Sequence, residues 1–119
     1  MDFDYRLQDK HAAKFVSFII LGVLYSLDKK LISIDEAEGF IFMPYVSKVV
    51  KQTKVPGALS DVDAVVKIIN AACELDDLER LRPELLSESI QTLIEETFLV
   101  IKNSKEIERL VNKDVSILK

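Results

Sequence analysis

The 119-residue sequence is poor in the residues that carry most catalytic, metal-binding and redox chemistry. It contains one cysteine, one histidine and no tryptophan. A lone cysteine cannot form a disulfide within the chain, which excludes a disulfide-stapled fold. A lone histidine excludes two-histidine metal sites, including the paired Glu-x-x-His motifs of di-iron bundles. These absences argue against an enzyme, and we expect no catalytic residues, no metal and no cofactor.

Glycine and proline are also scarce, with three of each, and no low-complexity stretch or internal repeat is visible. This composition excludes collagen-like and wholly disordered chains. The length suits one helical domain over residues 1–119. Sixteen Lys and Arg stand against twenty Asp and Glu, a net charge of −4 that argues against nucleic acid as a partner.

No basic segment opens the chain, as a secretory signal peptide would require. The longest apolar run, from Phe15 to Leu27, rises only ~20 Å as a helix, short of the ~30 Å core of a bilayer. We therefore expect a buried core helix without membrane association, in a soluble cytoplasmic protein.

Apolar residues recur at helical spacing along nearly the whole chain, and the alternation typical of strands is rare. The pattern predicts an all-α protein, a compact bundle of five to six helices around a buried first helix. Residues 76–82 are expected to form a polar turn, with room for a single helical turn inside it, and the tail 115–119 is left unassigned. The predicted helices cover Asp9–Leu27, Ile34–Phe42, Pro44–Gln52, Ser60–Leu75, a fifth from Pro83, and a last one after Asn103-Ser104 that carries Ile107, Leu110 and Val111.

Several residues predict local details of these helices. Ser33 and Glu36 have the spacing of a capping box, and Ser60 is placed to cap the fourth helix. The first helix is apolar nearly all round, which is typical of a helix that others surround. Gly22 in its middle suggests a close crossing with a neighbouring helix, since glycine there costs about 1 kcal/mol relative to alanine.

The side chains most often used in catalysis have structural explanations here. His11 is expected to be a satisfied polar residue in the first turn of its helix. Cys73 lies among apolar residues near a helix end, which favours an inert core thiol over a nucleophile. Four carboxylates are candidates for an acid–base pair, but they fall opposite the apolar stripe of their helix, as solvated surface would; they are Glu84, Glu88, Glu95 and Glu96.

Charge is distributed unevenly along the chain. Between Glu74 and Glu96 eight acidic residues stand against Arg80 and Arg82 only. This segment is either a solvated face or an acidic surface for a basic partner protein. The residues we expect at such a contact are Asp76, Asp77, Glu79, Glu84 and Glu88. A basic stretch with Lys48, Lys51 and Lys54 is too small to favour nucleic acid.

Two adjacent runs, Phe18–Leu27 and Leu31–Glu38, resemble the opening of a small family of bacterial helical proteins. In size, class and acidity the chain also resembles the all-helical immunity proteins of contact-dependent growth inhibition systems. The resemblance implies a cytoplasmic protein that binds and blocks one cognate toxin domain, often a nuclease. No catalytic motif lies in these runs, and no toxin-binding residue can be carried over by position.

Taken together, these features predict a binding protein, most concretely an immunity protein of a toxin system. It would neutralise a basic nuclease toxin by occluding its active site with an acidic surface. The alternative is a homo-oligomeric or adaptor helical domain without a toxin partner, with an apolar patch around Phe40, Phe42 and Tyr45. A monomer is favoured, although the sequence leaves the oligomeric state open.

Overall fold

The computed structural model describes residues 1–53, 59–104 and 109–119, and most of them are helical. Four of the α-helices have eight or more residues, and two have seven. The prediction of a mainly helical protein is confirmed, but the bundle of five to six helices is built from these four longer helices and two short ones. They are α1 (Ala12–Asp28), α2 (Ile34–Phe40), α3 (Pro44–Lys51), α4 (Leu59–Ala72), α5 (Leu75–Leu81) and α6 (Leu86–Asn103).

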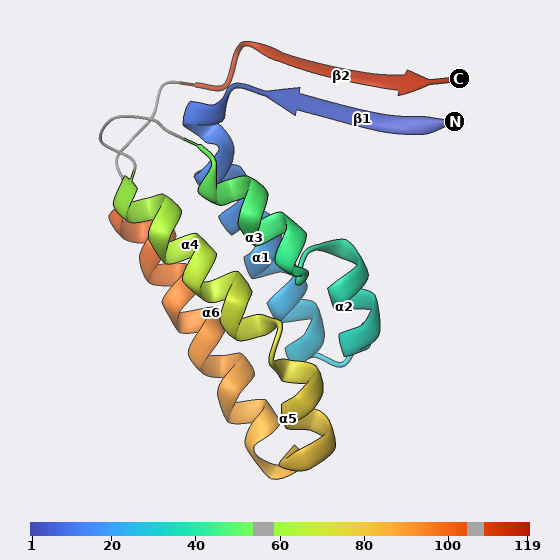
Figure 1. Ribbon diagram of the computed structural model, residues 1–119, viewed down its shortest axis with the longest axis vertical. Coiled ribbons are helices and arrows are strands. Elements are labelled where there is room, and N and C mark those ends of the chain that lie inside the picture. The colour runs from blue at the N-terminus through green and yellow to red at the C-terminus, as the bar shows by residue number, and fades with distance from the viewer. Residues whose placement is uncertain (54–58, 105–108) are drawn as a thin grey trace.

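The core lies where α1, α4 and α6 pack against one another, with α3 packed on α4 (Figure 1). α1 and α4 contribute the most deeply buried aliphatic side chains, which include Ile20, Leu24, Val65 and Ile69. α6 adds Leu93, and all these residues belong to one contiguous apolar cluster. These core residues recur at the helical spacing that the sequence shows along α1, α4 and α6.

The prediction that other helices surround α1 on every side is wrong. Phe18 and Tyr25 are each more than half exposed, and Gly22 lies on the same face of the helix. A Cβ atom built on Gly22 would meet no described atom within 4 Å outside its own stretch of helix, so no helix of the described chain crosses closely at that position. The neighbours of α1 cover only one side of it, and apolar spacing alone cannot indicate how many sides of a helix will be covered.

The local signals around α2 and α3 are confirmed. The Glu36 backbone N–H donates to Ser33 Oγ at 3.1 Å, and the Ser33 N–H donates to Glu36 Oε1 at 3.4 Å, which completes the capping box. Pro44 is the first residue of α3. The Ser47 hydroxyl then donates to Asn70 Oδ1 at 2.7 Å, which fixes α3 against α4.

Two predictions between α4 and α6 need correction. Ser60 is the second residue of α4, so it lies inside the helix that it was expected to cap. The expected polar turn over residues 76–82 is mostly the helix α5, followed by a 3-10 turn, η2 (Pro83–Leu85). α5 forms because Leu75 and Leu78 pack against the body, so tertiary contacts stabilise a helix too short to be stable alone.

The two ends of the chain form a β-ribbon that the sequence did not predict. β1 (Asp2–Leu7) pairs antiparallel with β2 (Lys113–Leu118), and a second 3-10 turn, η1 (Asp9–His11), joins β1 to α1. The predicted last helix is wrong for Leu110 and Val111, which precede β2 in non-helical conformation, and Ile107 lies outside the described residues. Both ends of the chain lie together at the projecting tip of the ribbon (Figure 1).

The ribbon touches the helical body chiefly at its base. The Tyr5 ring stacks on Phe15 of α1 with 5.0 Å between ring centroids. Farther along, Phe3 pairs with Ile117 across the two strands, and both side chains are more than half exposed. The pairing of β1 with β2 could not be predicted from local sequence patterns, because the two strands lie at opposite ends of the chain.

Candidate functional site

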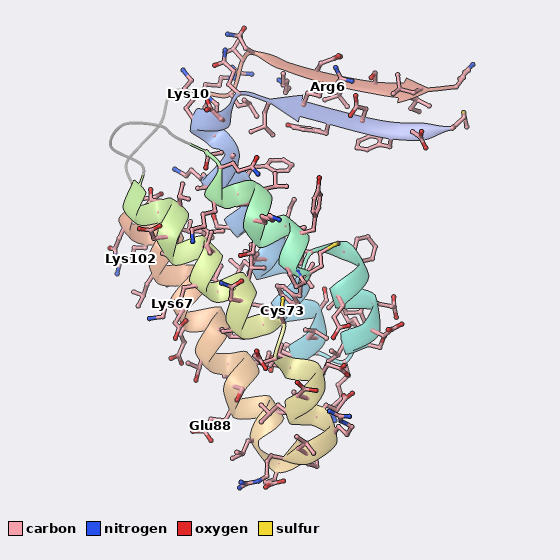
Figure 2. The ribbon with its side chains drawn as sticks, in the orientation of Figure 1. Arg6, Lys10, Lys67, Cys73, Glu88 and Lys102 are labelled. Carbon is pink, nitrogen blue, oxygen red and sulfur yellow. The ribbon has the colours of Figure 1, made fainter. Side chains whose placement is uncertain are left out.

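An open groove of about 720 Å³ lies between the second half of α4, α5 and the first half of α6. Its floor is apolar and its rim is mostly charged. Figure 2 shows Lys67 and Glu88, two of the rim residues, projecting from α4 and α6 on the same flank of the body. The apolar lining consists of Ala71, Leu75, Leu78, Leu81, Leu85 and Leu93, and the polar lining of Lys67, Glu74, Asp77, Arg82, Glu88, Ser89, Thr92 and Glu96.

The leucines of α5 create the floor because they follow one another at helical spacing from the core to the surface. Leu75 is buried, Leu78 is half-buried, and Leu81 is 68% exposed. Leu85, in the 3-10 turn that follows, extends the apolar surface toward α6. The groove therefore exposes aliphatic surface that nothing within the described chain covers.

The rim of the groove carries four carboxylates and two cations. One of the cations, Arg82, donates to Glu84 Oε1 at 2.6 Å, and this hydrogen bond lowers the pKa of Glu84. Arg80, outside the groove, donates to Asp77 Oδ1 at 2.7 Å. Lys67, the other rim cation, has no carboxylate partner within residues 1–53, 59–104 and 109–119, and the net charge of the rim is negative.

All five residues expected at a partner contact are exposed, but the structure divides them. Asp77 and Glu88 line the groove. Glu84 lies beside it through its bond to Arg82, and Glu79 lines a separate hollow near the end of α1. Asp76 faces α2, where it helps to raise the pKa of Glu38.

The apolar half of this site was not predicted from the sequence. Leu75 was expected at the end of the fourth helix, Leu78 and Leu81 in the polar turn, and Leu85 near the start of the fifth helix. Their alignment beneath the acidic rim was therefore not predicted. The signal was present as helical leucine spacing through the acidic segment. Glu74 and Glu96 also line the groove, although neither was among the five expected contact residues.

A second acidic cluster lies between α2 and α5, away from the groove floor. Burial raises the pKa of Glu38, and the nearby carboxylates of Asp76, Asp35 and Asp77 raise it further. Like charges disfavour ionisation of one another, so Glu38 holds its proton to higher pH than an isolated glutamate. The acidic segment therefore faces two sides of the molecule, and only one of them has an apolar floor.

The two reactive side chains lie outside the groove. Burial raises the pKa of the Cys73 thiol, with Glu38 and Glu74 adding to the effect, and a raised pKa disfavours the nucleophilic thiolate. His11 is buried at the start of α1. No group of three His, Cys, Asp or Glu residues with metal-binding geometry occurs within residues 1–53, 59–104 and 109–119.

Residues Asp9–Asp28 form a helical stretch that is long and apolar enough to cross a membrane by length and composition alone. The core helices of globular proteins pass the same test, and α1 packs against α4 and α6.

The sequence matches the family described as "Protein of unknown function (DUF3969)" over residues 8–116. The chain belongs to that family. The match includes all six α-helices and every residue that lines the groove, and it begins just after β1. No curated protein and no solved structure matches the chain.

Proposed function

We propose that this protein is a binding protein that holds a basic, amphipathic helix of another protein in the groove between α4, α5 and α6. The observation that carries the proposal is an exposed leucine floor bordered by carboxylates. Amphipathic helices bind hydrophobic grooves through apolar side chains spaced one turn apart. Carboxylates on the rim favour Lys and Arg on the flanks of the bound helix, and such complementarity raises the association rate and the specificity.

Within this class, we propose an immunity protein that acts in the cytoplasm on a basic nuclease toxin. Its acidic rim would bind cationic groups that a nuclease uses to hold phosphates, and its bulk would block the active site. The protein needs no chemistry of its own for this role, and a single binding event is sufficient. The support is the acidic, apolar-floored groove together with the resemblance of the chain to immunity proteins in size, class and acidity.

The groove can be tested with a synthetic helical peptide of leucine and lysine, arranged so that leucines occupy one face. Fluorescence anisotropy should detect binding that weakens as salt rises, because salt screens the rim charges. A peptide with glutamate in place of lysine should bind far more weakly. Equal binding of both peptides would contradict the role of the carboxylates.

Matched variants locate the binding site. Leu81→Glu places a charge on the exposed floor and should abolish peptide binding, whereas Leu99→Glu changes a leucine of similar exposure outside the groove. Asp77→Lys with Glu88→Lys should weaken binding about tenfold, since each rim charge contributes a few tenths to 1 kcal/mol. Asp76→Lys, on the side facing α2, is the charge control. Loss of binding with the control variants would place the site elsewhere.

The immunity role requires a separate test. The product of the neighbouring open reading frame is expressed alone and together with this chain, and cell growth is measured. Growth arrest that is rescued by the wild-type chain and not by Leu81→Glu supports the role. If the neighbouring product is harmless or does not bind, the immunity role is wrong and only the groove-binding proposal stands.

A second candidate function is a homo-oligomeric or adaptor domain, which the aromatic surface at the junction of α2 and α3 favours. Phe40 and Tyr45 are each 71% exposed there. Phe42, expected in the same patch, is buried in the core, so the patch is smaller than predicted. Phe40→Ser with Tyr45→Ser should lower self-association measured by light scattering if this surface forms the contact.

A further inference from the structure

The outer edge of β2 is an open sheet edge that faces away from the helices. β1 lies between β2 and the helical body (Figure 1), and within residues 1–53, 59–104 and 109–119 the sheet consists of these two strands alone. The outward row of β2 backbone N–H and C=O groups therefore has no strand partner within the described chain. A row of this kind is a template for pairing with another strand.

The middle of β2 lacks the features that usually protect such an edge. Charged residues stand only at its start, as Lys113 and Asp114, and the strand contains no proline. Val115, Ile117 and Leu118 are each about half exposed. Exposed edges in stable proteins are generally blocked by charge, proline or a bulge in the strand, so this edge is open to a partner.

The sequence of β2 is complementary to itself in antiparallel orientation. In a register centred on Ser116, Val115 lies opposite Ile117 of the second strand, and Ile117 opposite its Val115. Ser116 then lies opposite Ser116 of the second strand, on the other face of the sheet. Cross-strand pairs of β-branched residues and of hydroxyl residues both stabilise antiparallel sheets.

We propose that two copies of this chain associate through β2, forming a four-stranded sheet in the order β1-β2-β2-β1 around a twofold axis. In each copy β1 separates β2 from the helices. The two helical bodies therefore lie beyond opposite edges of the four-stranded sheet and do not collide. Pairing also doubles the number of strands in the sheet. This should stabilise the ribbon, because two-stranded ribbons are only marginally stable alone. The groove lies at the other end of the body, near α5, so this association leaves it free.

Site-directed crosslinking tests the register directly. Ser116→Cys, in a Cys73→Ser background, places two thiols across the twofold axis, where facing Cα atoms are about 4.5–5.5 Å apart, within the range of a disulfide. Asp4→Cys is the matched control, because Asp4 lies opposite Ser116 on β1, one strand away from the axis. Under mild oxidation Ser116→Cys should crosslink about tenfold faster than Asp4→Cys, because only its thiols lie within disulfide distance. Equal rates would overturn the proposal.

Light scattering and sedimentation of the intact chain give a second, reversible readout. The wild-type protein should form dimers as its concentration rises into the high micromolar range. Val115→Lys should shift this equilibrium toward the monomer, whereas Phe3→Lys, on the same face of the neighbouring strand, should leave it unchanged. A wild-type chain that stays monomeric, or a Phe3→Lys variant that loses dimers as readily as Val115→Lys, would overturn the proposal.

Discussion

The helical body buries its apolar side chains, whereas the terminal ribbon leaves many of its apolar side chains exposed to solvent. In the body, Ile20 and Leu24 are fully enclosed by α1, α4 and α6. In the ribbon, Phe3 and Ile117 pair with each other but remain 73% and 59% exposed. A two-stranded ribbon has no second layer to cover its apolar face. The comparison indicates that the body supplies most of the folding free energy, and that the ribbon is available for intermolecular contact.

The largest expected difference between the two regions is in the free energy of unfolding. Leu24→Ala removes a fully buried side chain and should cost about 2–5 kcal/mol. Phe3→Ala, at a mostly exposed position, should change stability by less than about 0.5 kcal/mol. Urea denaturation in dilute solution measures both. A similar loss from both variants would mean that the ribbon and the core unfold as one cooperative unit.

A smaller effect is expected where the two regions meet. Tyr5→Ala removes the ring stacked on Phe15, a contact of the kind that contributes about 0.5–1.5 kcal/mol beyond its buried area. Hydrogen exchange of the β1 and β2 amides should accelerate, while the amides of α1 keep their protection. Tyr5→Phe retains the ring and should behave as wild type. Faster exchange throughout α1 would show that the ribbon stabilises the body.

A substitution at Gly22, in the helical body, is expected to increase the free energy of unfolding. Because a Cβ atom at this position meets none of the described residues beyond its own stretch of helix within 4 Å, Gly22→Ala should stabilise the protein by about 0.5–1 kcal/mol through the helix propensity of alanine. The midpoint of thermal unfolding measures the change. A destabilising effect would mean that a neighbouring helix does pack closely against Gly22, as the sequence suggested.

The smallest expected effect concerns the acidic cluster between α2 and α5. Since burial and the neighbouring carboxylates raise the pKa of Glu38 in the folded state, its ionised form opposes folding at neutral pH. Glu38→Gln should therefore stabilise the protein slightly at neutral pH, by less than about 0.5 kcal/mol, because solvent screens most of the repulsion at this partly exposed site. The difference should shrink as pH falls through the raised pKa, because wild-type Glu38 then becomes neutral. Glu95→Gln, on the exposed face of α6, is the control, and an equal gain there would contradict the role of the cluster.

Much of the body could be predicted because its signals are local. The capping box at Ser33 and Glu36 and the start of α3 at Pro44 depend on neighbours within one helical turn. The helical character of the chain and most of its core follow from apolar spacing of the same range. The candidate site was predicted only in part, since the charge count identified Asp77 and Glu88 without the leucines between them.

The sequence by itself determined a mainly helical chain with an excess of acid between Glu74 and Glu96. Only the tertiary structure decided that α5 is a helix, that its leucines form a floor beneath an acidic rim, and that α1 has an exposed face. It also paired β1 with β2, whose residues lie at opposite ends of the chain. These features depend on contacts between residues distant in sequence, so neither propensity nor periodicity within a short window records them.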